Sequence, residues 1–273
     1  MKRKPSTIPG GVVLAAIVFC VRLPALAQTA PPLGVVEQFS VLGNSGVTGS
    51  TGAGTIVNGD VGSSPTASIS NFPPSSVTPP FTLHRFNDLT VQQARLDAIA
   101  AYNFLAAQGP GTVIAAQLDA AELTSGIYSF EGGAADLAKL GTLTLNGPGI
   151  FVFQVDSALT ANVGSSVTGT ADPCNVYWRI GTSATLNGDT FWGNVIADAS
   201  ITVGAGSDVT GRTIAGTGPT GAVTMAGGGG NTIGGCASSG AGGQAAIPTL
   251  SEWGIIALTA LLALTGVVVM RRM

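Results

Sequence analysis

Two strings in the second half of the chain repeat, and they decide the fold. Ala184-Thr185-Leu186 precedes Trp192-Gly193-Asn194-Val195-Ile196-Ala197, and Ile201-Thr202-Val203 precedes Thr210-Gly211-Arg212-Thr213-Ile214-Ala215. Val223-Thr224-Met225 opens a third copy. Thr185 and Thr202 lie 17 positions apart, and Gly193 and Gly211 lie 18 apart. A period this short cannot hold a helix pair or a propeller blade. It is typical of one turn of a β-solenoid, in which successive coils stack and share one core.

Each copy places a threonine between two apolar or small residues. Because side chains alternate along a strand, the neighbours are expected to enter the core while the threonine points outward, and stacked coils bring such positions to about 4.7 Å from one another. Threonine also favours strands for structural reasons alone, so the column has a purely structural interpretation too. An alternative outward column is Thr168, Trp192 and Thr210. The first candidate column consists of Thr144, Thr160, Thr185, Thr202 and Thr224.

Residues 88–108 interrupt the β pattern and predict one long helix. Alanine, leucine and glutamine dominate there, with Leu89, Leu96 and Ile99 near a helical period. Asn87 or Asp88 is suited to cap the start, and Gly109-Pro110 ends the segment. We expect the apolar stripe of this helix to pack on the side of the stacked coils.

The composition narrows the class of ligand. Charged residues make up only 9% of the 273 residues, apolar residues 45%, and the net charge is −3. No basic patch for nucleic acid is present, and regularly placed apolar residues argue against disorder. A surface of Thr, Ser, Asn, Gly and Ala fits a neutral ordered lattice as partner, either a glycan or water itself.

Residues for catalysis or metal binding are sparse, so we expect neither an enzyme nor a cofactor. His84 is the sole histidine and lies in a proline-flanked loop, where we expect it to be solvated. No His/Cys/Asp cluster suggests a metal site. Asp189, Asp198 and Asp208 fall on successive coils, as carboxylates do in β-helix polysaccharide lyases, but few Lys or Arg residues accompany them.

The N-terminus predicts export. Lys2-Arg3-Lys4 precedes an apolar run, and Ala25-Leu26-Ala27 supplies a small-x-small cleavage site, so residues 1–27 are expected to be a signal peptide. Once Cys20 leaves with that peptide, Cys174 and Cys236 remain. In an oxidising compartment this pair predicts one disulfide that ties the last coil to an interior one, and two separate thiols are the alternative.

The C-terminus predicts a membrane segment with a specific motif in front of it. A Gly/Ser/Ala linker at 237–246 leads into an apolar stretch within 247–273, which is closed by Arg271-Arg272 and is just long enough to span a bilayer. A plain C-terminal anchor is one interpretation. The segment also resembles the IPTL-type sorting signal of exosortase systems, which implies an exosortase-like processing enzyme and a Gram-negative envelope. The motif residues are Ile247, Pro248, Thr249, Leu250, Trp253 and Gly254.

The domain between these ends resembles the bacterial and fungal ice-binding protein family. The resemblance covers about residues 36–233 and follows the family's motif order. It implies a mainly β fold over residues 33–236, an irregular right-handed three-sided β-solenoid with one long α-helix packed alongside and with its N- and C-terminal coils side by side. It also implies ice or ordered water as partner. The alternative is a cell-surface adhesin or envelope-structural module that binds glycan or protein. The strings that carry the resemblance include Val57-Asn58-Gly59-Asp60-Val61-Gly62, Ser125-Gly126-Ile127-Tyr128-Ser129-Phe130, Phe151-Val152-Phe153-Gln154-Val155 and Cys174-Asn175-Val176-Tyr177-Trp178-Arg179-Ile180-Gly181.

Overall fold

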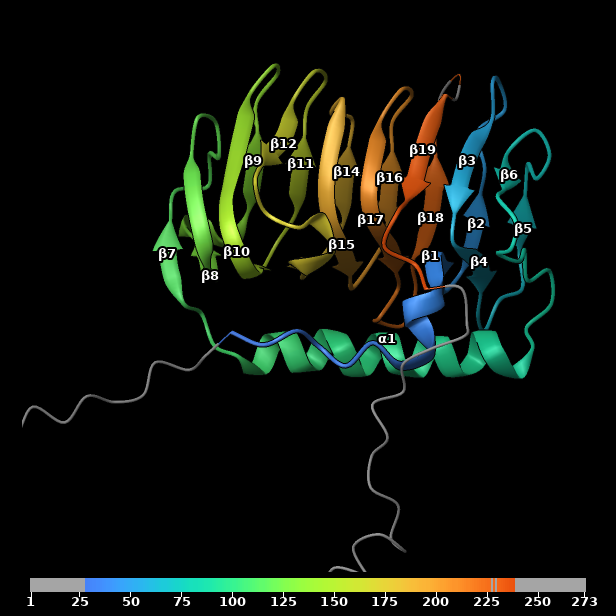
Figure 1. The fold of residues 1–273 in the computed structure, drawn as a ribbon. Helices are drawn as coiled ribbons and strands as arrows, with labels where there is room; N and C mark the ends of the chain where they lie inside the picture. The colour runs from blue at the N-terminus through green and yellow to red at the C-terminus, as the bar shows by residue number, and fades with distance from the viewer. Residues whose placement is uncertain (1–27, 227, 229, 239–273) are drawn as a thin grey trace, which may run out of the picture.

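The chain folds into parallel β structure with one long helix, as the sequence predicts. The computed structural model describes residues 28–226, 228 and 230–238. The predicted signal peptide (1–27) and sorting signal (247–273) lie outside these residues, as does most of the predicted linker. All pairings between the described strands are parallel, and the strands fall into a 12-stranded sheet and a 7-stranded sheet, named sheet A and sheet B (Figure 1).

Sheet B has the simpler pairing. Its strands are short, and each pairs with the equivalent strand of the next coil. In spatial order they are β5 (Ile69–Ser70), β2 (Gly46–Thr48), β18 (Ala222–Met225), β16 (Ile201–Val203), β14 (Ala184–Leu186), β11 (Leu159–Ala161) and β9 (Ala135–Leu137).

Sheet A contains the longer strands. Its main path is β6 (Ser76–Val77), β3 (Thr55–Asn58), β19 (Asn231–Gly234), β17 (Asp208–Ala215), β15 (Thr190–Ala197), β12 (Ser166–Gly169), β10 (Thr142–Val155), β8 (Glu122–Phe130) and β7 (Thr112–Ile114). Three further strands pair with the long ones off this path, namely β1 (Phe39–Gly43), β4 (Asp60–Ser63) and β13 (Val176–Ile180).

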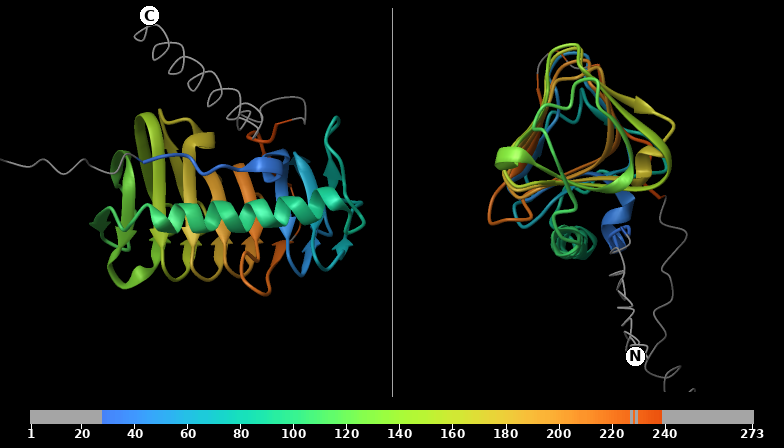
Figure 2. Two further views of the ribbon diagram at one scale, coloured as in Figure 1. Left: turned by 90° about the horizontal axis from the view of Figure 1, so that it is seen from below. Right: turned by 90° about the vertical axis from the view of Figure 1, so that its left-hand side faces the viewer.

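Sheet A bends within its long strands, so that it forms two sides of the molecule. Residues 142–145 of β10 pair with β12, whereas residues 151–155 pair with β13. Strand β15 likewise pairs with both β12 and β13, so these four strands close into a barrel-like ring. Gly193 and Gly211 mark the bend in β15 and β17 and are register partners with positive φ. Seen end on, the ribbon has a triangular outline with the helix under one side (Figure 2).

We name two of the three sides by whether the long helix covers them. The helix side consists of β1, β4, β7, β13 and the later parts of β8, β10, β15 and β17, and the helix lies over this side. The open side consists of β3, β6, β12, β19 and the earlier parts of the same long strands. Sheet B is the third side.

The N-terminal and C-terminal strands of the described residues lie side by side within the stack, as the resemblance implied. Strand β19 pairs with β3, β18 with β2, and β17 with β1, which joins the C-terminal coils to the N-terminal ones. After the N-terminal strands β1 to β6, the chain runs back along the whole stack as helix α1 (Leu89–Ala107) and then forms β7 at the other end (Figures 1 and 2).

Helix α1 lies within the predicted 88–108 segment, but it buries a different face from the one predicted. Its buried residues are Val91, Ala94, Ala98, Ala101 and Leu105, whereas Leu89 and Leu96 are 81% and 59% exposed. The predicted stripe was therefore wrong. The alanines are small enough to let the helix backbone approach the flat sheet closely, which larger leucines would prevent.

The interior is one continuous apolar core enclosed by the three sides, and a second cluster lies under α1. Aromatic rings stack within the first of these clusters: the ring centroids of Phe153 and Trp178 are 3.9 Å apart, and Trp178 also contacts Phe191. The predicted disulfide between Cys174 and Cys236 is present. Cys174 lies in the short helix η3 (Pro173–Asn175), in the corner insertion that precedes β13.

Candidate functional site

Sheet B carries an unbroken in-register column of threonines. Thr160 pairs with Thr185, Thr185 with Thr202, and Thr202 with Thr224. Each is half-buried between two buried residues, as the alternation predicts; Thr185, for example, stands between Ala184 and Leu186. Four of the five candidates therefore come together as one ladder.

The N-terminal coils extend this column in a way that sequence reasoning missed. Thr224 pairs with Thr48, and Thr48 with Ser70, whose hydroxyl lies 3.3 Å from that of Thr48. At the other end Asp136 pairs with Thr160. The Gly46-Val47-Thr48 string has the same pattern as the later copies. Its place in the ladder follows only from the N-terminal coils stacking on the C-terminal ones.

Thr144 does not belong to this column, and its inclusion was wrong. It lies in β10 on the open side, where it pairs with Thr168 and with Glu122. Thr144 and Thr160 are 16 residues apart because they lie on two different sides of the same turn of the stack: Thr144 is on the open side and Thr160 is on sheet B. The true coil-to-coil partner of Thr144 is Thr168.

The open side displays two parallel outward columns that are more mixed in composition. The alternative candidates Trp192 and Thr210 are register partners there, and the pairing of Ser166 with Thr190 aligns Thr168 with Trp192. A neighbouring column, which we did not predict, runs through Thr142, Ser166, Thr190, Asp208, Thr232, Ile56 and Ser76.

The surroundings of the sheet B column are small and neutral. Within the described residues, the hydroxyls of Thr160, Thr185, Thr202 and Thr224 make no hydrogen bond to protein atoms, so they are free to bind water. The residues two positions before or after these threonines are Ala158, Ser183, Ser200, Ala222, Asn162, Asn187, Gly204 and Ala226. Asp136 is the only charged member of the column as extended above.

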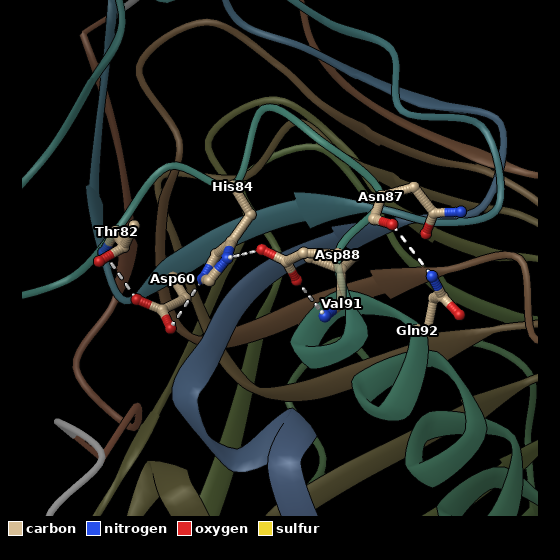
Figure 3. A network of polar contacts seen from close by, with 7 residues as sticks. All are labelled: Asp60, Thr82, His84, Asn87, Asp88, Val91 and Gln92. Atoms are coloured by element: carbon tan, nitrogen blue, oxygen red, sulfur yellow. Dashed lines mark hydrogen bonds and ion pairs between the residues drawn. The ribbon is translucent and has the colours of Figure 1, made fainter.

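His84 was expected to be solvated, but its side chain is only 12% exposed and bridges two carboxylates (Figure 3). Nε2 lies 3.3 Å from Asp60 Oδ2, and Nδ1 lies 3.1 Å from Asp88 Oδ2. A neutral imidazole has one N–H, so only the imidazolium donates to both. The hydrogen bond to Asp60 raises the pKa of His84, burial opposes this, and Asp88 raises it further.

This cluster holds the start of the helix. Asp88 is the N-cap of α1, because its Oδ1 accepts the Val91 N–H at 2.9 Å, and Asp60 Oδ1 accepts the Thr82 N–H at 2.7 Å (Figure 3). His84 therefore links strand β4, the loop before the helix and the helix cap. Among residues 28–226, 228 and 230–238, no group of three or more His, Cys, Asp or Glu side chains is placed to hold a metal ion.

Comparison with known proteins identifies the class to which these parallel strands, the flanking helix and the threonine column belong, and that class is the ice-binding proteins. The family described as Ice-binding-like matches residues 41–229, and the IPTL-CTERM motif matches residues 245–272. The chain is 38% identical to the ice-binding protein of Nostoc sp. (strain HG1), over 78% of this chain and 79% of that protein. It therefore belongs to the Ice-binding-like family and carries an IPTL-CTERM motif.

Solved structures give the same result. The ice-binding protein of the Antarctic ascomycete Antarctomyces psychrotrophicus is 33% identical, with a TM-score of 0.66, over 77% of this chain and 100% of that one. An ice-binding protein from an Antarctic biological consortium is 35% identical, with a TM-score of 0.67, over 84% of this chain and 96% of that one.

Proposed function

We propose that this protein binds ice through sheet B and that the column of Thr48, Thr160, Thr185, Thr202 and Thr224 is the contact surface. The observation that carries the proposal is their register: five threonines on five paired strands, spaced by about 4.7 Å along the stack. Each threonine offers a hydroxyl and a methyl group, so the column presents a regular alternation of hydrogen-bonding and apolar groups to water.

Rigidity makes such a surface effective. Adsorption to ice orders surface groups, and each immobilised side chain costs free energy unless it is already fixed. Threonine is β-branched and has restricted χ1 rotation, and the ladder holds its backbone on both sides. Ordered water is therefore recognised with little loss of conformational entropy.

The open side is less suited to a flat lattice. Trp192 replaces a hydroxyl-bearing residue in one of its columns and packs partly against the core, and Ile56 and Asp208 interrupt the other column; Ile56 is 52% exposed. Bulky and charged groups break the regular spacing of hydroxyls. For this reason we assign ice contact to sheet B and keep Thr168, Trp192 and Thr210 as the alternative surface.

We further infer that the domain is an irregular right-handed three-sided β-solenoid that spans residues 33–236. The parallel pairing from coil to coil and the triangular outline in Figure 2 support this description. All described strands, α1, both apolar clusters and the disulfide lie within these limits. The match also covers the whole solved chain of the ascomycete protein. On these grounds we propose that residues 28–240 contain a complete folding unit.

For location, we propose export and display at the surface of a Gram-negative cell, with residues 1–27 as signal peptide and 237–246 as linker. The IPTL-CTERM match supports a sorting signal that is processed by an exosortase-like enzyme. The apolar run before Arg271-Arg272 is our basis for proposing a membrane segment within 247–273. The proposed signal peptide and the proposed membrane segment both lie outside the described residues. Within the described residues, no helix is both long and apolar enough to cross a membrane. The domain would then be held at the surface or released from it, and we propose no enzymatic activity for it.

The test uses purified residues 28–240 in assays of ice recrystallisation inhibition and thermal hysteresis. We expect inhibition of recrystallisation and a measurable freezing gap, both of which scale with protein concentration. No effect in either assay at high concentration, from a protein that melts cooperatively, would contradict ice binding. That negative result would favour the adhesin alternative, and a glycan-binding screen with the same fragment would test it.

A further inference from the structure

The described chain ends at a reinforced corner of the molecule. After β19, Cys236 is disulfide-bonded to Cys174, 62 residues earlier, and the Ser238 N–H donates to the Glu37 carbonyl at 3.2 Å. Beyond Ser238 the sequence leads to the IPTL-CTERM match at 245–272. The corner is the junction of the open side and the helix side, because Cys174 follows β12 and precedes β13.

A buried arginine binds the same corner from inside. Arg212 is 2% exposed, and its guanidinium donates to Asn194 Oδ1 at 2.6 Å, to the Glu37 carbonyl at 2.8 Å and to the Cys236 carbonyl. Asn194 in turn donates to the carbonyls of Cys174 and Val176, each at 3.0 Å. One cation therefore joins an N-terminal segment, the last described residues and two interior coils, using neutral carbonyl and amide acceptors.

We propose that this corner, built from Cys174, Cys236, Arg212 and Asn194, is a force-bearing attachment point that presents sheet B outward when the chain is held by its C-terminus. The proposal rests on the proposed function, since it assumes a C-terminal tether and ice contact at sheet B. It adds where the load enters the domain and how the domain is oriented.

The path of force explains the need for a covalent link. Without the disulfide, tension on Ser238 would fall first on β19, whose pairs with β17 and β3 cover three and four residues. Detaching β19 would remove one of the joints between the C-terminal and N-terminal coils. With the disulfide, tension passes from Cys236 to Cys174 and into β13, which pairs with β10 over five residues and with β15 over four.

The position of the corner favours outward display. In a three-sided stack, each corner lies opposite one side, and the corner between the open side and the helix side lies opposite sheet B (Figure 2). A domain suspended from this corner keeps its threonine column away from the point of attachment. A tether at either of the other two corners would lie at an edge of sheet B.

Force spectroscopy on residues 28–240 tests the attachment. One handle is placed at residue 240 and the other on an azide-bearing residue in place of Lys139, which is exposed. We expect Cys174→Ser/Cys236→Ser to lower the first rupture force and to lengthen the extension by about 200 Å, the reach of 62 extended residues. Leu145→Ala, a core truncation outside the corner, controls for general destabilisation and should keep the higher first rupture force. An unchanged first rupture force in the double serine variant would overturn the proposal.

Bead adhesion tests the orientation separately. Beads coupled through residue 240 are expected to adhere to ice, and beads coupled through the position of Ala205, an exposed residue after sheet B strand β16, are expected to adhere much less. Equal adhesion, or adhesion only through position 205, would overturn the orientation. If the free fragment lacks ice activity, the proposed function fails instead, and the rupture experiment still decides whether the corner bears force.

Discussion

Thr185 and Thr202 are register partners on neighbouring strands of sheet B, although 17 positions separate them in the chain. Their separation is one turn of the stack. The register continues through Thr160, Thr224 and Thr48, although the corresponding sequence spacings are irregular. The corners absorb the insertions while the side of sheet B stays regular, as a lattice-binding surface requires.

Replacing Thr185 or Thr202 by tyrosine or arginine is expected to abolish thermal hysteresis and recrystallisation inhibition, because a long side chain lifts the flat surface away from ice. Each threonine is half-buried at the surface, so the free energy of unfolding should change by no more than about 0.5 kcal/mol. Ice assays and urea unfolding measure the two effects on the same preparations.

Thr144→Tyr is the matched control for that experiment. Thr144 lies in a strand of similar burial pattern, but on the open side beside Thr168. It should leave ice activity intact. If Thr144→Tyr removes activity while Thr185→Tyr retains it, the open side is the contact surface, and Thr168, Trp192 and Thr210 become the residues to replace next.

The Thr144 error shows what sequence periodicity provides and what it lacks. The alternation of apolar and polar residues identified Thr144, Thr160, Thr185, Thr202 and Thr224 as outward, and each one proved to be half-buried between buried neighbours. Alternation does not say to which of three sides a strand belongs. That depends on corner lengths, and strand β10 extends over 14 residues and serves two sides. Thr48 was missed because its partner Thr224 lies at the other end of the sequence.

The helix and His84 show a second limit. The length of α1 and its Asp88 cap followed from local chemistry, since capping depends on residues a few positions apart. The buried face of α1 could not be predicted in this way. The alanines at 94, 98 and 101 contribute little to a hydrophobic pattern, and their small side chains let the helix pack close to the sheet. His84 lies in a loop whose contacts with Asp60 form only when the N-terminal coils are in place, so its burial left no local signal.

His84 is expected to make stability depend on pH. Its pKa is raised in the folded protein, chiefly by the hydrogen bond to Asp60, so the folded state holds the proton more tightly than the unfolded chain. The resulting stabilisation is fully present below the unfolded-state pKa of about 6.5 and is lost as pH rises through the folded-state pKa. The melting temperature of residues 28–240 should therefore fall as pH rises from slightly acidic to alkaline.

His84→Gln provides the comparison for this measurement. The chain has one histidine, so the variant removes the side chain that titrates in this range while keeping a polar group. We expect the variant to be less stable at low pH and to show a flatter dependence between pH values of about 6 and 8. A wild-type slope that survives the substitution would show that another group is responsible.

Reduction of the disulfide is expected to destabilise the domain. Closing a loop of 62 residues contributes roughly 4 kcal/mol in the chain-entropy description. Urea unfolding of residues 28–240 with and without a thiol reductant measures the difference. The Cys174→Ser/Cys236→Ser variant should have the same free energy of unfolding as the reduced protein, and the reductant should not change that value. Ice activity at low temperature should persist, because sheet B lies away from the bridge. Equal stability in both redox states would contradict the prediction.

The bend in sheet A is expected to depend on glycine at position 211. Gly211 has φ of +152°, and a Cβ there would lie 1.9 Å from the Gly193 carbonyl oxygen. Gly206 also has positive φ, at +75°, but a Cβ there meets no atom within 4 Å. Gly206→Ala should cost on the order of 1 kcal/mol from the backbone alone. Gly211→Ala should cost clearly more or prevent folding. Equal unfolding midpoints would show that the stack adjusts freely at the bend.

The native C-terminus decides whether the sorting signal is used. The IPTL-CTERM match spans 245–272, and cleavage within the motif would separate the domain and its linker from the apolar segment. In the host cell we expect mass spectrometry to find a chain that ends near Thr249, together with the Cys174–Cys236 bridge. Replacing Pro248 and Trp253 together should block processing and leave the uncut chain with the membranes. An intact Met273 in the membrane fraction of unaltered cells would show instead that the segment is a permanent anchor.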